Sequence, residues 1–376
     1  MERPTNNSTD GMGAEGVSRD SVLRLLLTGI DTVECAYYLR AAGPCGIDFE
    51  RLTALREELR QAKVREPGVI ELGGVGFLLH PYGSSSGYPL VMSNTDFHIQ
   101  FGEFNDPSFF VRFPSEALWR LGAFTLHRRF LEWAASVGLV PVKPEGLSRV
   151  DWAHDYHLSL IDFDEDSFVS LASKDAHYRE DRKAQTFQFG ADDVVLRVYN
   201  KIMEILQKSH KTWFFDLWGC SENVWRVEWQ VRKTLLRRFG IRTFENLQER
   251  QGDALRYLAT EHDTLRVANG DENRSRWPLH PLWVDLIERI KTLPSLGVYR
   301  EIDPATALNE RMTYIAQSIY GYLKRVAAIY ALKNGKDSVS RERAAAFLEL
   351  YLKPLHDPMS WQVDVTKRRD QMRLGQ

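Results

Sequence analysis

Short runs of alternating hydrophobic and polar residues fill the first two thirds of the 376-residue chain, and longer runs with helical periodicity fill the last third. Alternation over a few residues is typical of half-buried strands, whereas apolar residues three or four apart indicate helices. In the first part, the strand pattern appears in IDTVECAYYL, VIELGGVGFLLH, PLVMSNTDFHIQFGE and FFVRF. The turn residues GG, GSSSG and NDP punctuate this part of the chain, which favours hairpins or a meander.

Two helices are predicted beside this first sheet, over 48–64 and 115–137. Ser115 has the residue type of a helix N-cap. Strand patterns then return in LSRVDWAHDYHL, TFQF, VVLRVYNK and NVWRVEWQV, which predict a second sheet.

The last third has the pattern of helices, predicted over 243–268, 281–293, 305–333 and 341–352. We therefore expect an α+β fold with two mainly antiparallel sheets backed by helices, followed by a helical C-terminal region. The expected division is a disordered segment at 1–20, a β-rich unit for DNA binding or scaffolding at 21–140, the second sheet at 141–242, helices at 243–355 and a basic tail at 356–376.

Composition excludes some classes of protein. Hydrophobic residues make up 43% of the chain and charged residues 27%, and no apolar run reaches the roughly 18 residues of a membrane span. The polar N-terminal stretch lacks the pattern of a secretory signal, so we expect a cytoplasmic protein with no membrane partner. The three cysteines have neither disulfide-framework nor zinc-site spacing. A net charge of -2 leaves nucleic-acid binding to be judged from local charge.

Three of the predicted strands segregate polar side chains onto one face. Residues two apart in a strand share a face, so the polar and apolar residues of each strand separate. If the three strands are neighbours, their polar faces form one charged surface. The polar faces carry Arg149, Asp151 and Asp155; Arg197, Tyr199 and Lys201; and Arg226, Glu228 and Gln230.

This surface contains the ingredients of phosphodiester chemistry. Carboxylates without nearby sulfur or paired histidines suit Mg²⁺ or Mn²⁺, which makes Asp151, Asp155 and Glu228 candidate ligands. Lys201 and Arg197 would favour the phenolate form of Tyr199. Attack by that phenolate on DNA would leave a 5′-phosphotyrosyl link and a free 3′-hydroxyl.

The pattern also has structural interpretations. A sheet with one solvated face alternates in the same way, and Asp151 and Glu228 could form structural ion pairs. Glu204 is either a residue favoured at a helix start or an assistant in proton transfer or metal binding. His154 and His157 lack the spacing of a His-hydrophobe-His metal motif, so we expect both to be structural or to contact DNA.

The same stretches resemble the Rep_trans family, which includes initiators of rolling-circle plasmids, replication proteins of some filamentous phages and relaxases of certain integrative conjugative elements. The shared pattern is an R-x-D strand, a hairpin ending in R-[IV]-Y-[ND]-K-x-x-E and an R-[FVW]-E strand that leads into a basic helix. The close match spans about 148–242. The matching positions are Arg149, Asp151, Arg197, Tyr199, Asn200, Lys201, Glu204, Arg226 and Glu228.

The resemblance implies a nicking enzyme that initiates rolling-circle replication. Tyr199 would be the nucleophile, assisted by Arg197, Lys201 and Glu204, with dependence on Mg²⁺ or Mn²⁺. The DNA would be an origin, single-stranded at the nick, and a homodimer and a helicase are further expected partners. A conjugative relaxase with the same chemistry and a non-catalytic origin-binding regulator remain alternatives.

Basic residues after the last strand are candidates for DNA binding. The run RKTLLRRFGIR contains no acid, and backbone phosphates are natural partners for such a segment. Its leucines also fit the core stripe of a helix with a solvated basic face. The predicted DNA-binding set, with two arginines from the strand faces, is Arg149, Arg226, Arg232, Lys233, Arg237, Arg238 and Arg242.

Overall fold

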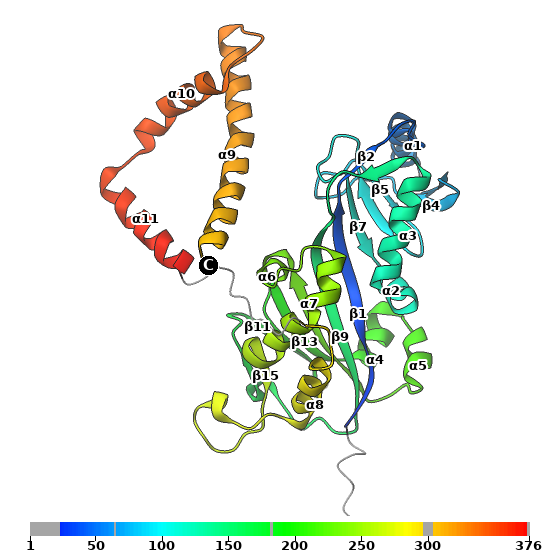
Figure 1. Cartoon of the computed structure of the whole chain (residues 1–376). Helices are drawn as coiled ribbons and strands as arrows, with labels where there is room; N and C mark the ends of the chain where they lie inside the picture. Colours follow the sequence, from blue (N-terminus) through cyan, green and yellow to red (C-terminus); the bar gives the residue numbers. More distant parts are fainter. Residues whose placement is uncertain (1–22, 64, 181–182, 296–303, 374–376) are drawn as a thin grey trace, which may run out of the picture. The chain divides into compact units, whose positions relative to one another are not determined.

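Eleven strands pair into one antiparallel sheet in the order β11-β12-β13-β14-β9-β1-β7-β6-β5-β4-β3 (Figure 1). The computed structural model describes residues 23–63, 65–180, 183–295 and 304–373, so the disorder expected for 1–20 lies outside the described residues. The strands of this sheet are β1 (Leu23–Tyr37), β3 (Gly68–Leu72), β4 (Val75–Leu79), β5 (Leu90–Ser93), β6 (His98–Phe101), β7 (Phe109–Phe113), β9 (Gly146–Leu158), β11 (Asp175–Glu180), β12 (Lys183–Phe189), β13 (Val194–Asn200) and β14 (Val224–Arg232).

Two long strands join the halves of the sequence. β1 pairs with β7 on one side and with β9 on the other, and β9 also pairs with β14. The α+β class, the antiparallel pairing and the helical C-terminal region are confirmed. The two sheets expected from the sequence are instead joined edge to edge, because β1 extends beyond the predicted strand and pairs along β9.

Two short two-stranded sheets accompany the large one. Strand β2 (Leu39–Ala41) pairs with β8 (Leu139–Pro141), and β10 (Phe168–Ser170) pairs with β15 (Asp263–Leu265). At the β3–β4 turn, Gly73 and Gly74 have φ values of 60° and 74°, a conformation that suits glycine. The turn predicted at the GG pair is therefore confirmed.

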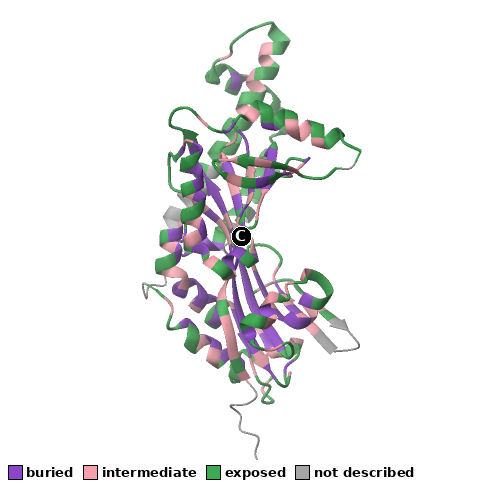
Figure 2. Cartoon of the chain, turned by 90° about the vertical axis from the view of Figure 1, so that its right-hand side faces the viewer, coloured by how far each residue is buried: buried purple, intermediate pink, exposed green. Residues whose placement is uncertain are grey.

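Helices pack against the apolar face of the sheet. Trp229 of β14 packs edge-on against Trp283, and Tyr37 of β1 packs against Phe130, so both halves of the sheet share one core. Figure 2 shows that buried residues are concentrated along the strands. The helices of this part are α1 (Phe49–Gln61), α2 (Ser115–Leu121), α3 (Ala123–Ser136), α4 (Lys201–Glu204), α5 (Trp213–Trp218), α6 (Lys233–Arg238), α7 (Phe244–Tyr257) and α8 (Pro281–Ile290), with short turns of other helical type at Glu165–Ser167, Ile205–Ser209, Leu258–His262 and Arg274–Arg276.

Two predicted helices are interrupted. The helix expected over 115–137 breaks at Gly122, whose φ of 78° and ψ of 154° are not helical, into α2 and α3. Pro114 occupies the N-cap position, and the Ser115 hydroxyl donates to Asp31 instead of capping the helix. The helix expected over 243–268 ends as α7 and is followed by strand β15, whose Asp263 accepts a hydrogen bond from Trp229.

The chain divides into two units, Met1–Arg300 and Glu301–Gln376, which differs from the expected division. Segments 21–140 and 141–242 share one sheet, and α7 and α8 pack on it, so no unit boundary falls at 140 or 242. The second unit contains α9 (Pro304–Asn334), α10 (Arg341–Leu352), a short turn at Lys353–Leu355 and α11 (Pro358–Arg373).

The basic tail expected from 356 onward is thus largely helical over the described residues. Within the described part of the chain, no helix combines the length and apolar character needed to cross a lipid bilayer.

Candidate catalytic site

The three strands with segregated polar residues are neighbours in the sheet, in the order β13-β14-β9. Tyr199 lies opposite Arg226, which lies opposite Asp155, so the three side chains form one row across the sheet. Arg197 lies opposite Glu228 in the next row. Residues directly opposite each other in paired strands project from the same face. The structure therefore brings the predicted polar positions onto one surface, called the polar face below.

The Tyr199 hydroxyl donates a hydrogen bond of 3.0 Å to the Glu228 carboxylate. Tyr199 is 8% exposed, and burial raises its pKa well above the usual value of 10, with the charge of Glu228 adding to the shift. This direction is opposite to the expectation that Arg197 and Lys201 would favour phenolate. To become a phenolate, the Tyr199 hydroxyl must pass its proton to the paired carboxylate, or an arriving positive charge must stabilise the phenolate.

Glu228 connects the tyrosine to the arginines. Arg197 Nη1 donates to Glu228 Oε1 at 3.3 Å, and it also lies 3.5 Å from Gln230 Oε1. The Arg197 side chain is 28% exposed, against 10% for Glu228. Arg197 is thus the outer member of the Tyr199–Glu228–Arg197 chain and the one that an approaching phosphate can reach.

Arg226 is buried below this chain, with a side chain that is 0% exposed. Asp155 receives two hydrogen bonds from it, of 2.6 and 2.8 Å, and Asp31 receives one of 2.8 Å. Its guanidinium also lies 4.7 Å from the ring centre of Phe214 and 5.7 Å from that of Trp119. Although burial opposes its charge, Asp155 and Asp31 hold the pKa of Arg226 well above its usual value.

This burial corrects two predicted roles. Arg226 was expected to contact DNA, but no part of its side chain is accessible. Asp155 was expected to bind metal, but it is 0% exposed, and its second oxygen also accepts from Trp218 Nε1 at 2.9 Å. Both residues hold helix α5 and strand β1 against the polar face.

The predicted metal ligands do not fit a divalent ion in this arrangement. Asp151 binds Arg149 through both carboxylate oxygens, Asp155 binds Arg226, and Glu228 binds Tyr199 and Arg197. Across 23–63, 65–180, 183–295 and 304–373, no three His, Cys, Asp or Glu side chains are arranged to hold a metal. Arginines occupy the positions around these carboxylates that a cation would need.

Asp151 is nevertheless strongly affected by its burial. It is 2% exposed, and burial raises its pKa to about 6 despite the hydrogen bond from Arg149. Glu34 lies 3.5 Å from Arg149 on the other side. The Arg149 guanidinium therefore bridges two acids.

Lys201 and Glu204 lie just beyond the end of strand β13. Asn200 caps helix α4 by accepting from the Met203 backbone N–H at 3.1 Å, so Lys201 is the first helical residue and not part of the strand. Its ammonium donates to Glu204 at 2.6 Å and lies 5.5 Å from the ring centre of Tyr199. Burial lowers the pKa of Lys201. The predicted assistants are therefore near the tyrosine ring, but they are paired with each other.

The polar face also depends on residues that the sequence patterns did not single out. Asp31 accepts hydrogen bonds from Arg226, from Ser115 and, at 2.7 Å, from Trp119 Nε1. Its position falls where the β1–β9 register shifts, between Ile30 and Thr32. An acid inside the apolar run LLLTGIDTVECAY was the available signal.

A row of arginines crosses the polar face at the far end of the same strands. Arg112 of β7 lies opposite Glu34, Glu34 opposite Arg149, and Arg149 opposite Arg232 of β14. Arg112 and Arg232 are exposed, and no hydrogen bond or ion pair holds either side chain among the described residues. At 4.7–4.9 Å per strand, the two lie roughly 14 Å apart across the sheet.

The remaining predicted basic residues lie elsewhere. Helix α6 packs Leu235 and Leu236 into the core under the apolar face, which leaves its basic side chains outside the polar face. Only Arg232, the last residue of β14, belongs to the arginine row. The exposed members of this group are Arg232, Lys233, Arg237, Arg238 and Arg242.

The two histidines of the HDYH run do not form a metal pair. His154 is buried on the apolar face, where its Nδ1 lies 2.8 Å from the Thr28 hydroxyl, and burial lowers its pKa to about 4. His157 is half-buried near the end of β9.

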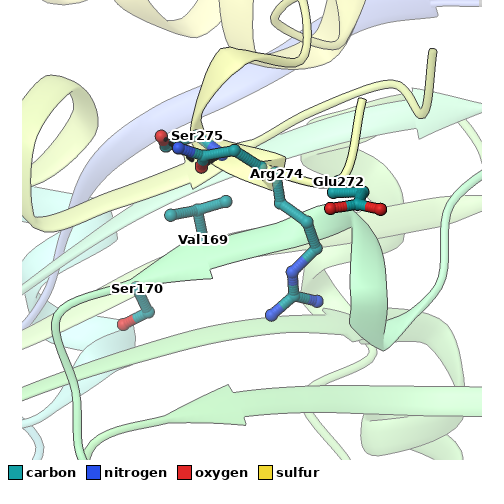
Figure 3. A pocket seen from close by; sticks show the side chains of 6 residues that line it. Val169, Ser170, Glu272, Arg274 and Ser275 are labelled. Carbon is teal, nitrogen blue, oxygen red and sulfur yellow. Dashed lines mark hydrogen bonds between the residues drawn. The ribbon is translucent and has the colours of Figure 1, made fainter. Parts of the chain in front are cut away.

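A pocket of about 520 Å³ lies away from the tyrosine, between strand β10 and the 272–275 segment. Figure 3 shows Arg274 extending from that segment beside Val169 and Ser170. Arg274 already pairs with Asp166 at 3.0 Å, and no lining residue belongs to the three strands of the polar face. The polar face is therefore the better candidate site.

No family model and no curated protein matches the chain. Among solved structures, the chain is similar to a rolling circle replication initiator protein from Geobacillus stearothermophilus, at 17% identity and a TM-score of 0.43. That similarity covers 74% of this chain and 99% of the other. The proposal below rests on the residues of the polar face.

Proposed function

We propose that the protein initiates rolling-circle replication by nicking one DNA strand with Tyr199. The observation that carries the proposal is the hydrogen bond from the Tyr199 hydroxyl to Glu228, next to an accessible Arg197. A nucleophile is activated by an adjacent base that can take its proton, and here Glu228 is placed to act as that base for Tyr199.

In this proposal the phosphodiester first meets Arg197. Its guanidinium exchanges its 3.3 Å contact with Glu228 for a phosphate oxygen, which leaves Glu228 free to take the phenolic proton. The Tyr199 oxygen then forms a bond to phosphorus as the bond from phosphorus to the 3′ oxygen breaks. That oxygen takes a proton from water and becomes the 3′-hydroxyl primer, while the 5′ phosphate stays linked to Tyr199.

Positive charge for this step comes from the arginines of the site. Arg197 contacts the phosphate, and Arg226 lies 3.9 Å from Glu228 and opposes the rise in the Tyr199 pKa. Because the carboxylates are paired with arginine or tyrosine, no step is assigned to a metal ion. Dependence on Mg²⁺ or Mn²⁺ stays a prediction from the sequence.

The arginine row offers a path for the strand next to the nick. Arg112, Arg149 and Arg232 lie in one row across the sheet. This row crosses β14 six residues, or about 20 Å, from Arg226, the residue opposite Tyr199. Single-stranded DNA follows basic surfaces through its phosphates. A helicase that separates the strands, and a second copy of the chain, are the partners that this function would use.

The experiment incubates the full chain with supercoiled plasmid that carries the DNA flanking its gene. We expect nicked circles linked covalently to the protein, and none with Tyr199→Phe. The matched control is Tyr156→Phe, because Tyr156 is also buried, lies two strands away on β9, and donates to Asp285 at 3.0 Å on the other face. Nicking that survives in Tyr199→Phe would remove Tyr199 from the site.

One observation favours a second function. The raised pKa of Tyr199 and its low exposure would suit a protein that binds origin DNA without cutting it. In that case the wild type would retain DNA affinity in the same assay and form no covalent complex.

A further inference from the structure

Three aromatic side chains in the segment that follows Tyr199 stack in a column. The rings of Trp213 and Phe214 lie 3.9 Å apart between centres at an interplanar angle of 23°, and those of Phe214 and Trp218 lie 4.9 Å apart at 19°. All three contribute to a small hydrophobic cluster that is separate from the main core. At one end of the column, Trp218 donates its indole N–H to the buried Asp155 at 2.9 Å. Trp213, Phe214 and Trp218 are called the aromatic column below.

The middle of the column is fixed to the polar face beside the tyrosine. The Phe214 ring is 0% exposed, and its centre lies 4.7 Å from the Arg226 guanidinium. The Lys201 ammonium lies 5.4 Å from the Phe214 ring centre and 5.5 Å from that of Tyr199. These contacts set the position of the aromatic column relative to the proposed nucleophile.

The other end of the column, at Trp213, is open. Trp213 is half-buried, and Phe214 is the one aromatic ring that stacks on it among the residues that the structure describes. Its indole N–H donates no hydrogen bond within those residues, whereas Trp119 and Trp218 of the same cluster each donate to a buried aspartate. Leu217, one turn further along the same side of α5, is 49% exposed. Stacking within the chain therefore uses one face of the Trp213 ring.

Two lysines precede the open end of the column. Lys208 is exposed and Lys211 is half-buried, and within the described part of the chain neither ammonium donates a hydrogen bond. Lys211 reaches toward the polar face: burial alone would raise the pKa of Asp31, but the charges of Arg226 and then of Lys211 hold that pKa below its usual range. Proteins bind single-stranded DNA with this combination, because bases stack on the aromatic ring and phosphates pair with the cations.

We propose that an unpaired DNA base next to the scissile phosphate stacks on the open face of Trp213. Lys208 and Lys211 bind neighbouring phosphates of the same strand. Every base has an aromatic face, and in a duplex that face is covered by the adjacent base pairs, so this site selects unpaired nucleotides without selecting a sequence. The proposal rests on the proposed function for the arrival of a strand at Tyr199, but the stacking itself involves no cleavage.

A stacking role and a packing role for Trp213 predict different effects of two substitutions. Trp213→Leu keeps an apolar side chain against Phe214 and has no ring, whereas Trp213→Phe keeps a smaller ring. Loss of a base-stacking ring weakens single-strand binding about 5- to 150-fold. We therefore expect Trp213→Leu to weaken binding at least about 5-fold and Trp213→Phe to stay within about 3-fold of the parent. A packing role would give the two variants equal affinity.

The test measures affinity on the full chain carrying Tyr199→Phe, so that cleavage does not interfere. The probe is a fluorescent single-stranded oligothymidine of about 20 nucleotides, followed by anisotropy. The matched control is Phe104→Leu, which removes a 93% exposed ring outside the column and should leave affinity unchanged. Thermal unfolding followed by circular dichroism checks that each variant is folded.

A second measurement keeps Trp213 in place and decides the matter even if Trp213→Leu does not fold. The same oligonucleotide with 5-iodouracil in place of thymine, irradiated with near-ultraviolet light, should become attached to Trp213, as mapped by mass spectrometry. Attachment only at other residues, equal affinity of the two Trp213 variants, or no binding of the oligonucleotide would each overturn the proposal. If Tyr199→Phe still nicks plasmid, the proposed function fails while the stacking result stands.

Discussion

Replacing Asp155 with asparagine tests whether the buried arginine holds the polar face together. The carboxylate accepts two hydrogen bonds from Arg226 and one from Trp218, and all these groups are at most 5% exposed. An amide of the same shape removes the charge and turns one acceptor oxygen into a donor that faces other donors. Breaking a buried ion pair from one side costs about 3–5 kcal/mol. Asp31 remains beside Arg226, so we expect the lower end of that range.

Urea unfolding followed by tryptophan fluorescence measures this loss. Trp361 is the single tryptophan of the second unit, so the signal reports mainly on the first. The matched control is Asp166→Asn, which breaks an exposed pair with Arg274 at 3.0 Å and should barely move the urea midpoint. A loss below about 1 kcal/mol for Asp155→Asn would refute the role given to the buried pair. If that variant does not fold, Arg226→Met with Asp155→Leu and Asp31→Asn should restore folding, since the three replacements together leave no buried charge without its partner.

Three further predictions follow from the polar face. Burial raises the folded-state pKa of Asp151 to about 6, so the folded protein binds the extra proton and loses stability as pH rises from about 4 to 6. The free energy of unfolding from urea titrations, relative to Asp151→Asn, should fall by at most about 3 kcal/mol over that window, and a rise would contradict the assignment. Arg112→Gln and Arg232→Gln should each lower affinity for a single-stranded oligonucleotide and reduce the salt dependence by about one charge, measured by fluorescence anisotropy on Tyr199→Phe protein, whereas exposed Arg51→Gln should do neither. Because the carboxylates of the polar face are paired with arginine or tyrosine, nicking should continue in EDTA; nicking that stops in EDTA and returns with Mg²⁺ or Mn²⁺ would contradict this account and support the metal dependence predicted from the sequence.

The row of Tyr199, Arg226 and Asp155 could be predicted because strand residues alternate, and alternation is a local property of the sequence. Burial of that row could not. It depends on Trp119 of α2 and on Phe214 and Trp218 of α5, which reach the polar face from distant parts of the chain. The same residues changed Arg226 from an expected DNA contact into a buried ion-pair partner.

The direction of the Tyr199 pKa shift shows the same limit. Arg197 and Lys201 are close in sequence, and neighbouring cations alone would favour phenolate. In the folded chain Arg197 is turned to Glu228 and Lys201 to Glu204, so their charge is compensated. The ion pairs across the strands and at the start of helix α4 therefore determine the direction of the Tyr199 pKa shift, for which sequence proximity predicted the opposite sign.

The continuous pairing of β1 along β9 bears on the distance along DNA between the point where the protein would bind a strand and the point where it would cut it. Arg112 and Tyr199 lie on strands of one sheet, so under the proposed function the place where a DNA strand is held would be joined directly to the place where it is cut. Their separation is set by the backbone hydrogen bonds that join the strands between them. Lengthening the DNA by one nucleotide between the two points would shift the cut by one nucleotide relative to the bound sequence.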